Sequence, residues 1–158
     1  MDKSPIIIGN DHGGYKLKLD ILKALEERGI EYNDIGCDSE EIVRYPHYAK
    51  KVAEAVSKGE YKRGILICST GIGMSIAANK FKGVRASMVS DHYTAAMTKQ
   101  HNDSNILCFG GKMIGVFQAV DILETWLTNE YIGGRHDISL NLIKDIEEKL
   151  IRDCKEQH

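Results

Sequence analysis

The feature that most constrains this chain is a regular alternation of short apolar runs and helical patterns. Five runs are each followed by a stretch of helical periodicity, at spacings of roughly 20–30 residues. The runs cover residues 6–8, 30–35, 65–67, 84–89 and 106–109. This rhythm is typical of an α/β fold in which helices cover both faces of a parallel sheet. In such a sheet, ligands bind beyond the carboxyl ends of the strands.

The helices are expected between Tyr15 and Gly29 and at 48–58, 74–80, 91–100 and 113–127. Residues 36–46 and 131–137 are expected to be polar loops. A last helix is expected over 140–154, with apolar residues on one side and charges on the others. Such a terminal helix either packs on its own domain or against a second subunit, and the sequence leaves both open.

The bulk composition predicts a single globular domain over residues 1–158. The net charge of −2 gives no electrostatic reason to expect nucleic acid or an anionic membrane as a partner. No apolar run approaches the ~20 residues of a membrane span. The first residues lack the apolar core and cleavage site of a signal peptide, so we expect a cytoplasmic location.

Metal and nucleotide cofactors are not expected. The four cysteines, Cys37, Cys68, Cys108 and Cys154, are scattered without a CxxC pair, which predicts neither a disulfide framework nor a zinc site. The histidines lack HxxxH or HExxH spacing. Neither a complete GxGxxG fingerprint nor a GxxxxGK[ST] loop is present.

The stretch GILICSTGIGMSIAANK at 64–80 carries the strongest chemical signal. It places Cys68 at the carboxyl end of a strand, before a glycine-bearing turn and the start of a helix. Backbone N–H groups at such a turn can stabilise a thiolate and hold an anion. The amides around Gly71 to Ser75 are candidates for stabilising an oxyanion.

Other polar residues are expected near the same edge of the sheet. They are Asp11 and His12 after the first strand, Lys112 after the fifth, and His101 and Asn102 just before the fifth. With Arg135 they provide the groups for proton transfer next to a carbonyl and for clamping a phosphate. The alternatives are that Asp11 only caps a turn, that His101 and Asn102 form an ordinary helix end, and that Arg135 is a surface residue.

Seven segments together resemble the ribose-5-phosphate isomerase type B family, in the same superfamily as the galactose-6-phosphate isomerase subunits. They are GNDHGGYKLK at 9–18, YPHYA at 45–49, GILICSTGIGMSIAANK at 64–80, KGVRA at 82–86, KQHNDSNIL at 99–107, FGGK at 109–112 and GGRH at 133–136. The resemblance implies a Rossmann-like three-layer α/β/α sandwich. It also implies homodimers, sometimes paired into tetramers, with metal-free active sites at the dimer interface.

The resemblance further implies interconversion of ribose 5-phosphate and ribulose 5-phosphate through an enediolate. Cys68 would be the base, assisted by Thr70, and the segment from Ser69 through Gly71 and Ile72 to Gly73 would line the enediolate. His101 with Asp11 would open the furanose ring. The remaining substrate-binding positions would be Asn102 and Tyr45 for the sugar hydroxyls, and His12, Lys112 and Arg135 for the phosphate.

Four positions depart from the family pattern. Ser69 replaces a glycine, Arg44 an aspartate and Lys112 a frequent arginine, while Ser139 replaces a second arginine after Arg135. A charge-assisted hydrogen bond of about 1.5–3 kcal/mol is lost at the last position. The same chemistry on another aldose phosphate, such as a tetrose, pentose or hexose phosphate, is therefore the alternative. A non-catalytic sugar-phosphate- or nucleotide-binding module is a second alternative.

Overall fold

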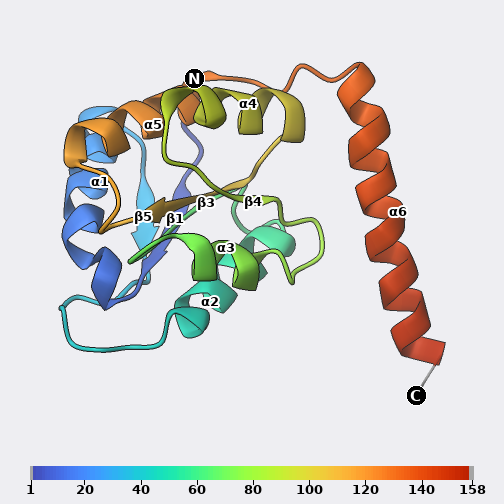
Figure 1. Cartoon of the computed structure of the whole chain (residues 1–158), viewed down its shortest axis with the longest axis horizontal. Coiled ribbons are helices and arrows are strands. Elements are labelled where there is room, and N and C mark those ends of the chain that lie inside the picture. The colour runs from blue at the N-terminus through green and yellow to red at the C-terminus, as the bar shows by residue number, and fades with distance from the viewer. Residues whose placement is uncertain (1, 157–158) are drawn as a thin grey trace.

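The computed structural model contains a five-stranded parallel sheet in the order β2-β1-β3-β5-β4, with helices on both faces (Figure 1). It describes residues 2–156. The strands are β1 (Ile6–Asn10), β2 (Tyr32–Asp34), β3 (Arg63–Cys68), β4 (Ala86–Met88) and β5 (Ile106–Gly110). The helices are the short 3-10 helix η1 (His12–Gly14) and α1 (Tyr15–Glu27), α2 (Tyr45–Ser57), α3 (Ile72–Ala78), α4 (His92–Asn102), α5 (Val116–Thr128) and α6 (Arg135–Glu156). The predicted fold class is confirmed.

The three central strands explain why the sequence shows continuous apolar runs instead of alternation. Every residue of β1, β3 and β5 is buried, because helices cover both faces of the sheet there. The edge strands β2 and β4 are short, and none of their residues is buried. This is why their sequence signals were weaker and their predicted lengths too great.

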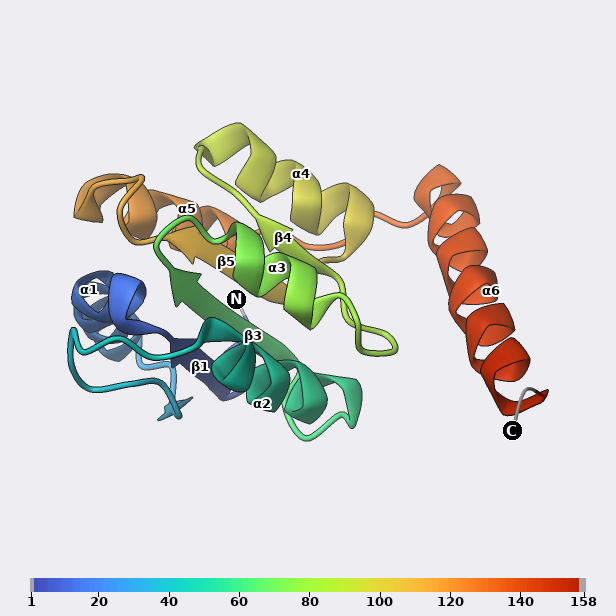
Figure 2. The same ribbon diagram turned by 60° about the horizontal axis from the view of Figure 1, so that its bottom comes forward.

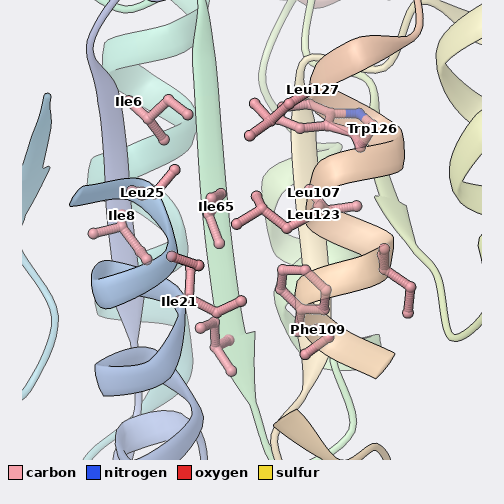
Figure 3. Packing of buried hydrophobic residues seen from close by; sticks show 14 of the residues in the cluster. Ile6, Ile8, Ile21, Leu25, Ile65, Leu107, Phe109, Leu123, Trp126 and Leu127 are labelled. Atoms are coloured by element: carbon pink, nitrogen blue, oxygen red, sulfur yellow. The ribbon is translucent and has the colours of Figure 1, made fainter. Parts of the chain in front are cut away.

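Two apolar clusters fix the helices to the sheet. Figure 3 shows the first, in which Ile21 and Leu25 of α1 and Leu123 and Trp126 of α5 point toward the strands. Full burial of such a side chain stabilises the fold by about 1.5–3 kcal/mol. The second cluster lies on the opposite face under α2 and α3, and it includes Cys68.

Helix α6 stands apart from the sheet and its covering helices (Figures 1 and 2). None of its residues is buried. The N–H of Gly83 donates to both carboxylate oxygens of Glu147 at 3.1 Å, which ties α6 to the turn before β4. An open groove of about 400 Å³ remains between them, lined in part by Ile143 and Ile146. The sequence left open whether this helix packs on its own domain or against a second subunit. In the structure α6 does not pack closely on its own domain.

Several predicted helix boundaries were wrong. Helix α2 begins at Tyr45 instead of Tyr48, since proline near a helix start is favourable and Pro46 occupies that place. Helix α5 begins at Val116 rather than Met113. Helix α6 begins at Arg135, so residues 135–137 are helical and not loop. Among residues 2–156, no helix combines the length and apolar character that crossing a membrane requires.

Candidate active site

The loops after β1, β3 and β5 meet at the carboxyl edge of the sheet. The N–H of Gly111 donates to the carbonyl of Cys68 at 2.7 Å, and the N–H of Lys112 donates to that of Ser69 at 3.1 Å. A Cβ added to Gly13 would collide with the Ser69 hydroxyl, and one added to Gly111 would lie 2.6 Å from the Gly13 carbonyl oxygen. The glycines therefore allow the three loops to touch and form one continuous surface.

Cys68 ends β3 with 5% of its surface exposed. The N–H of Gly71 donates to its Sγ at 3.1 Å. The thiolate, not the thiol, is the form of a cysteine that can accept a proton. Gly71 has a φ of +78°, and a Cβ there would lie 2.8 Å from Met88 Cγ. The turn that aims an N–H at the sulfur thus requires glycine at this position.

Residues 69–73 form an open surface beside the thiol, which we call the shelf. Ser69 is half-buried and Thr70 is exposed. The Thr70 hydroxyl accepts from the N–H of Ile72 at 3.3 Å. A Cβ on Gly73 would lie 2.8 Å from Cζ of Tyr45, so the Tyr45 ring lies directly against this shelf.

Asp11 and His12 occupy the turn after β1. Asp11 is 5% exposed, and its Oδ1 accepts from the N–H groups of Gly13 at 2.9 Å and Gly14 at 3.2 Å. The capping geometry that the sequence left open for Asp11 is therefore present. Nδ1 of His12 accepts from the N–H of Val43 at 3.3 Å. That bond selects the tautomer with the proton on Nε2.

His101 and Asn102 lie at the other edge of the sheet. Helix α4 starts level with the carboxyl end of β5 and runs back, so its last residues precede the start of that strand. Ile106 pairs with Gly64 and Gly110 with Cys68, so about 13 Å of strand separates the two edges. Figure 2 shows the last turn of α4 at the opposite end from the start of α3. The sequence predicted that His101 and Asn102 lie at the carboxyl edge of the sheet, near Cys68. Within one chain this prediction is wrong.

Arg135 belongs with this amino-edge group. It is exposed in the first turn of α6, and the neighbouring His136 ring stacks on His101 with centroids 4.2 Å apart and planes 11° from parallel. Desolvation, followed by the nearby His101 and Arg135, lowers the pKa of His136 from its ordinary value. The N–H of Ile132 donates to the carbonyl of Gln100 at 3.1 Å, which fixes the linker beside α4.

Comparison with known proteins places the chain in a family. The profile described as Ribose/Galactose Isomerase matches residues 6–143. The chain belongs to this family. It is 49% identical over 144 residues to the ribose-5-phosphate isomerase B of Escherichia coli K12, which covers 91% of this chain and 97% of that protein.

Solved structures agree with this membership. The structure of the Clostridium thermocellum ribose-5-phosphate isomerase B has a TM-score of 0.90 at 49% identity, covering 92% of this chain and 99% of that one. The ribose-5-phosphate isomerase B of Mycoplasma genitalium, solved with bound ribulose 5-phosphate, has a TM-score of 0.89 at 34% identity, covering 94% and 99%. The predicted resemblance to this isomerase family is confirmed.

The positions that depart from the family pattern lie on different edges. Ser69, Lys112 and the exposed Arg44, which directly precedes α2, are at the carboxyl edge. Ser139 is exposed in α6, one turn after Arg135. The serine at position 139 therefore removes a positive charge at the amino edge. Arg44 adds a positive charge at the carboxyl edge.

The sequence analysis did not identify the buried ammonium group of Lys18, on the helix that follows the Asp11 turn. Lys18 is 3% exposed, although lysine side chains are almost always found on the solvated face of a helix. A signal was available, because Lys18 precedes Ile21 and Leu25 by three and seven residues and shares their buried stripe. No group of three or more His, Cys, Asp or Glu side chains within residues 2–156 is arranged to bind a metal ion.

Proposed function

We propose that this protein interconverts D-ribose 5-phosphate and D-ribulose 5-phosphate, using Cys68 as the base. The observation that carries the proposal is the Cys68 turn, in which a nearly buried thiol accepts an N–H donor beside an open shelf of backbone amides. Membership of the Ribose/Galactose Isomerase family supports the reaction class. The relatives named for ribose 5-phosphate support the substrate.

The thiolate of Cys68 takes the proton from C2 of the open-chain aldose. The electron pair of the broken C–H bond forms the C1–C2 double bond of an enediolate, and the negative charge moves to O1. Backbone N–H groups near Gly73 stabilise that charge, while the Gly71 N–H serves the sulfur. Return of the proton to C1 regenerates the thiolate, and Thr70 assists transfer of the hydroxyl proton from O2 to O1. A ketone then stands at C2 and the reaction balances without a co-reactant.

The remaining proposed roles are divided between the two edges of the sheet. At the carboxyl edge Asp11 takes part in ring opening, Tyr45 holds a sugar hydroxyl, and His12 and Lys112 face the phosphate. At the amino edge His101 transfers the ring-opening proton, Asn102 holds a hydroxyl, and Arg135 faces the phosphate.

A site divided in this way requires a second subunit. Within one chain the two groups lie at opposite edges, so a homodimer with two-fold symmetry unites the carboxyl edge of one subunit with the amino edge of its partner. Exposed apolar side chains near the carboxyl edge support such an interface. Phe117 is 91% exposed, Met113 66% and Ile72 49%. The apolar side of α6, including Leu142 at 59% and Leu150 at 60%, provides further surface for a partner.

A coupled assay of ribose 5-phosphate conversion tests the proposal. The wild type is expected to turn over, and Cys68→Ala to lose about 10²–10⁴-fold in kcat, the usual contribution of a general base. Cys108→Ala is the matched control, because this thiol is fully buried on the neighbouring strand. Burial, followed by the nearby Cys68, raises the pKa of Cys108 above its ordinary value, and with none of its surface exposed Cys108 has no access to a substrate. Turnover that survives Cys68→Ala unchanged would sink the mechanism.

The same chemistry on another aldose phosphate is the second candidate. Ser139 one helical turn after Arg135 favours it, since the partner edge then offers one guanidinium there instead of two. Comparison of kcat/KM for tetrose, pentose and hexose phosphates decides between them. A higher value for any other sugar phosphate than for ribose 5-phosphate replaces the first candidate by the second.

A further inference from the structure

Lys18 is a buried cation on the helix that follows the Asp11 turn. Its Nζ forms an ion pair with Oδ2 of Asp34 at 2.8 Å and donates to the carbonyl of Cys37 at 2.7 Å. The ammonium also lies 5.5 Å from the centre of the Tyr15 ring. Asp34 is the last residue of β2 and Cys37 lies in the segment that follows, so the cation connects α1 to the end of β2 and the start of that segment.

The segment held by Lys18 covers the residue before Asp11. The side-chain amide of Asn10 donates to the carbonyls of Cys37 at 3.3 Å and Asp11 at 2.9 Å, and the N–H of Cys37 donates back to the carbonyl of Asn10 at 3.2 Å. A Cβ on Gly36 would collide with Oδ1 of Asn10. Lys18 and Asn10 therefore share the Cys37 carbonyl, and together they fix the start of the segment.

The other end of the same segment enters the proposed site. Val43 donates its N–H to His12, and Arg44 leads directly into Tyr45, whose ring lies against Gly73. Residues 36–44 contain no helix or strand of their own, so their position depends on such anchors. Loss of the anchor at Lys18 is expected to release His12 and Tyr45 from their places beside the shelf.

We infer that Lys18 is a positioning residue, which anchors segment 34–44 so that His12 and Tyr45 are held ready to bind the sugar phosphate. The inference rests on the proposed function. Lys18 acts on substrate binding more than on proton transfer, because Asp11 has anchors of its own. Gly13 and Gly14 donate to the Asp11 carboxylate, and the N–H of Asp11 donates to the carbonyl of Ile67 at 3.1 Å.

The test is Lys18→Met, which keeps an unbranched apolar side chain and removes the charge. KM for ribose 5-phosphate is expected to rise about 10-fold, equivalent to about 1.4 kcal/mol, while kcat changes less than about threefold. Amide hydrogen exchange of residues 36–45 is expected to accelerate in the same variant, a readout that does not depend on turnover.

Arg28→Met is the matched control. Arg28 is a partly buried cation that directly follows the last residue of the same helix, and it too contacts one carboxylate, that of Glu124, and one carbonyl, that of Ala24. It lies at the end of α1 away from the Asp11 turn, so its loss is expected to lower thermal stability without raising KM. If Lys18→Met does not fold, Asp34→Asn decides, because it removes the ion pair only and is expected to raise KM in the same direction by a smaller factor.

An unchanged KM in the folded variant, unchanged exchange of residues 36–45, or an equal rise in KM for Arg28→Met overturns the inference. Failure of the proposed function is a separate result, since it shows as absence of turnover in the wild type.

Discussion

The two edges of the sheet contribute to the proposed site in different ways. At the carboxyl edge, three loops from buried central strands touch one another, and glycines that admit no Cβ fix their spacing. At the amino edge, His101 comes from the end of α4 and Arg135 from the exposed start of α6. The stacked rings of His101 and His136 join these two helix ends. The first group is held by contacts between loops of the same chain, whereas Asn102 and Arg135 of the second are exposed on the surface. In the proposed dimer, one half of the site is therefore built by folding and the other by association.

The largest effect is expected from His101→Asn at the amino edge. Loss of the proton donor for ring opening is expected to lower kcat/KM for ribose 5-phosphate about 10²–10³-fold. Ribulose 5-phosphate is an open-chain ketose, and exchange of its C1 proton with solvent requires enediolate formation but no ring opening, so the rate of this exchange is expected to fall much less. His92→Asn, at the other end of the same helix, is the control and keeps full activity. Equal losses in the isomerisation of ribose 5-phosphate and in the C1 exchange of ribulose 5-phosphate would remove ring opening from the role of His101.

A smaller loss is expected from Gly71→Ala at the carboxyl edge. The added Cβ would lie 2.8 Å from Met88 Cγ and 2.9 Å from the carbonyl carbon of Phe109, so the turn has to move. Displacement of catalytic groups by about 1 Å is expected to reduce kcat about 10²-fold. Gly83→Ala separates strain from collision, because Gly83 has a similar φ of +72° but nothing within 4 Å of an added Cβ.

Only the strain of the left-handed conformation, about 1–2 kcal/mol, is expected for Gly83→Ala. Thermal unfolding and kcat of both variants measure the two contributions. Equal stability and activity in the two variants would contradict the rigid packing of the carboxyl edge.

The smallest effect is a pH dependence of the amino edge. The pKa of His136 is lowered in the folded protein by desolvation and by the adjacent His101 and Arg135. The unfolded chain therefore binds the proton first, and stability is lost as the pH falls below about 6.5 through the lowered value. Melting temperatures measured from about pH 7.5 to 5 are expected to decline less in His136→Gln than in the wild type. Curves of melting temperature against pH that run parallel for the two proteins would show that His136 does not contribute to the pH dependence.

The sequence predicted the buried half of this molecule better than the exposed half. Continuous apolar runs and glycine turns marked β1, β3, β5 and the Cys68 turn, because burial on both faces leaves a strong pattern. The edge strand β2 and the start of α6 at Arg135 left weaker signals, since few of their side chains are buried.

The placement of His101 could have been foreseen from topology. A helix between parallel strands runs back, so residues just before a strand lie at its amino edge. The role of Lys18 could not be predicted, because its partners Asp34 and Cys37 come from an irregular segment whose path no periodicity describes.

Subunit complementation tests the division of the site most directly. Cys68→Ala and His101→Asn, each nearly inactive alone, are unfolded, mixed in equal amounts and refolded together. In a mixed dimer one site carries both changes and the other carries neither. Half of the dimers are mixed and half of their sites are intact, so about a quarter of wild-type activity is expected to return. Activity that stays at the level of the separate variants would show that both residues act within one subunit, and would contradict the account.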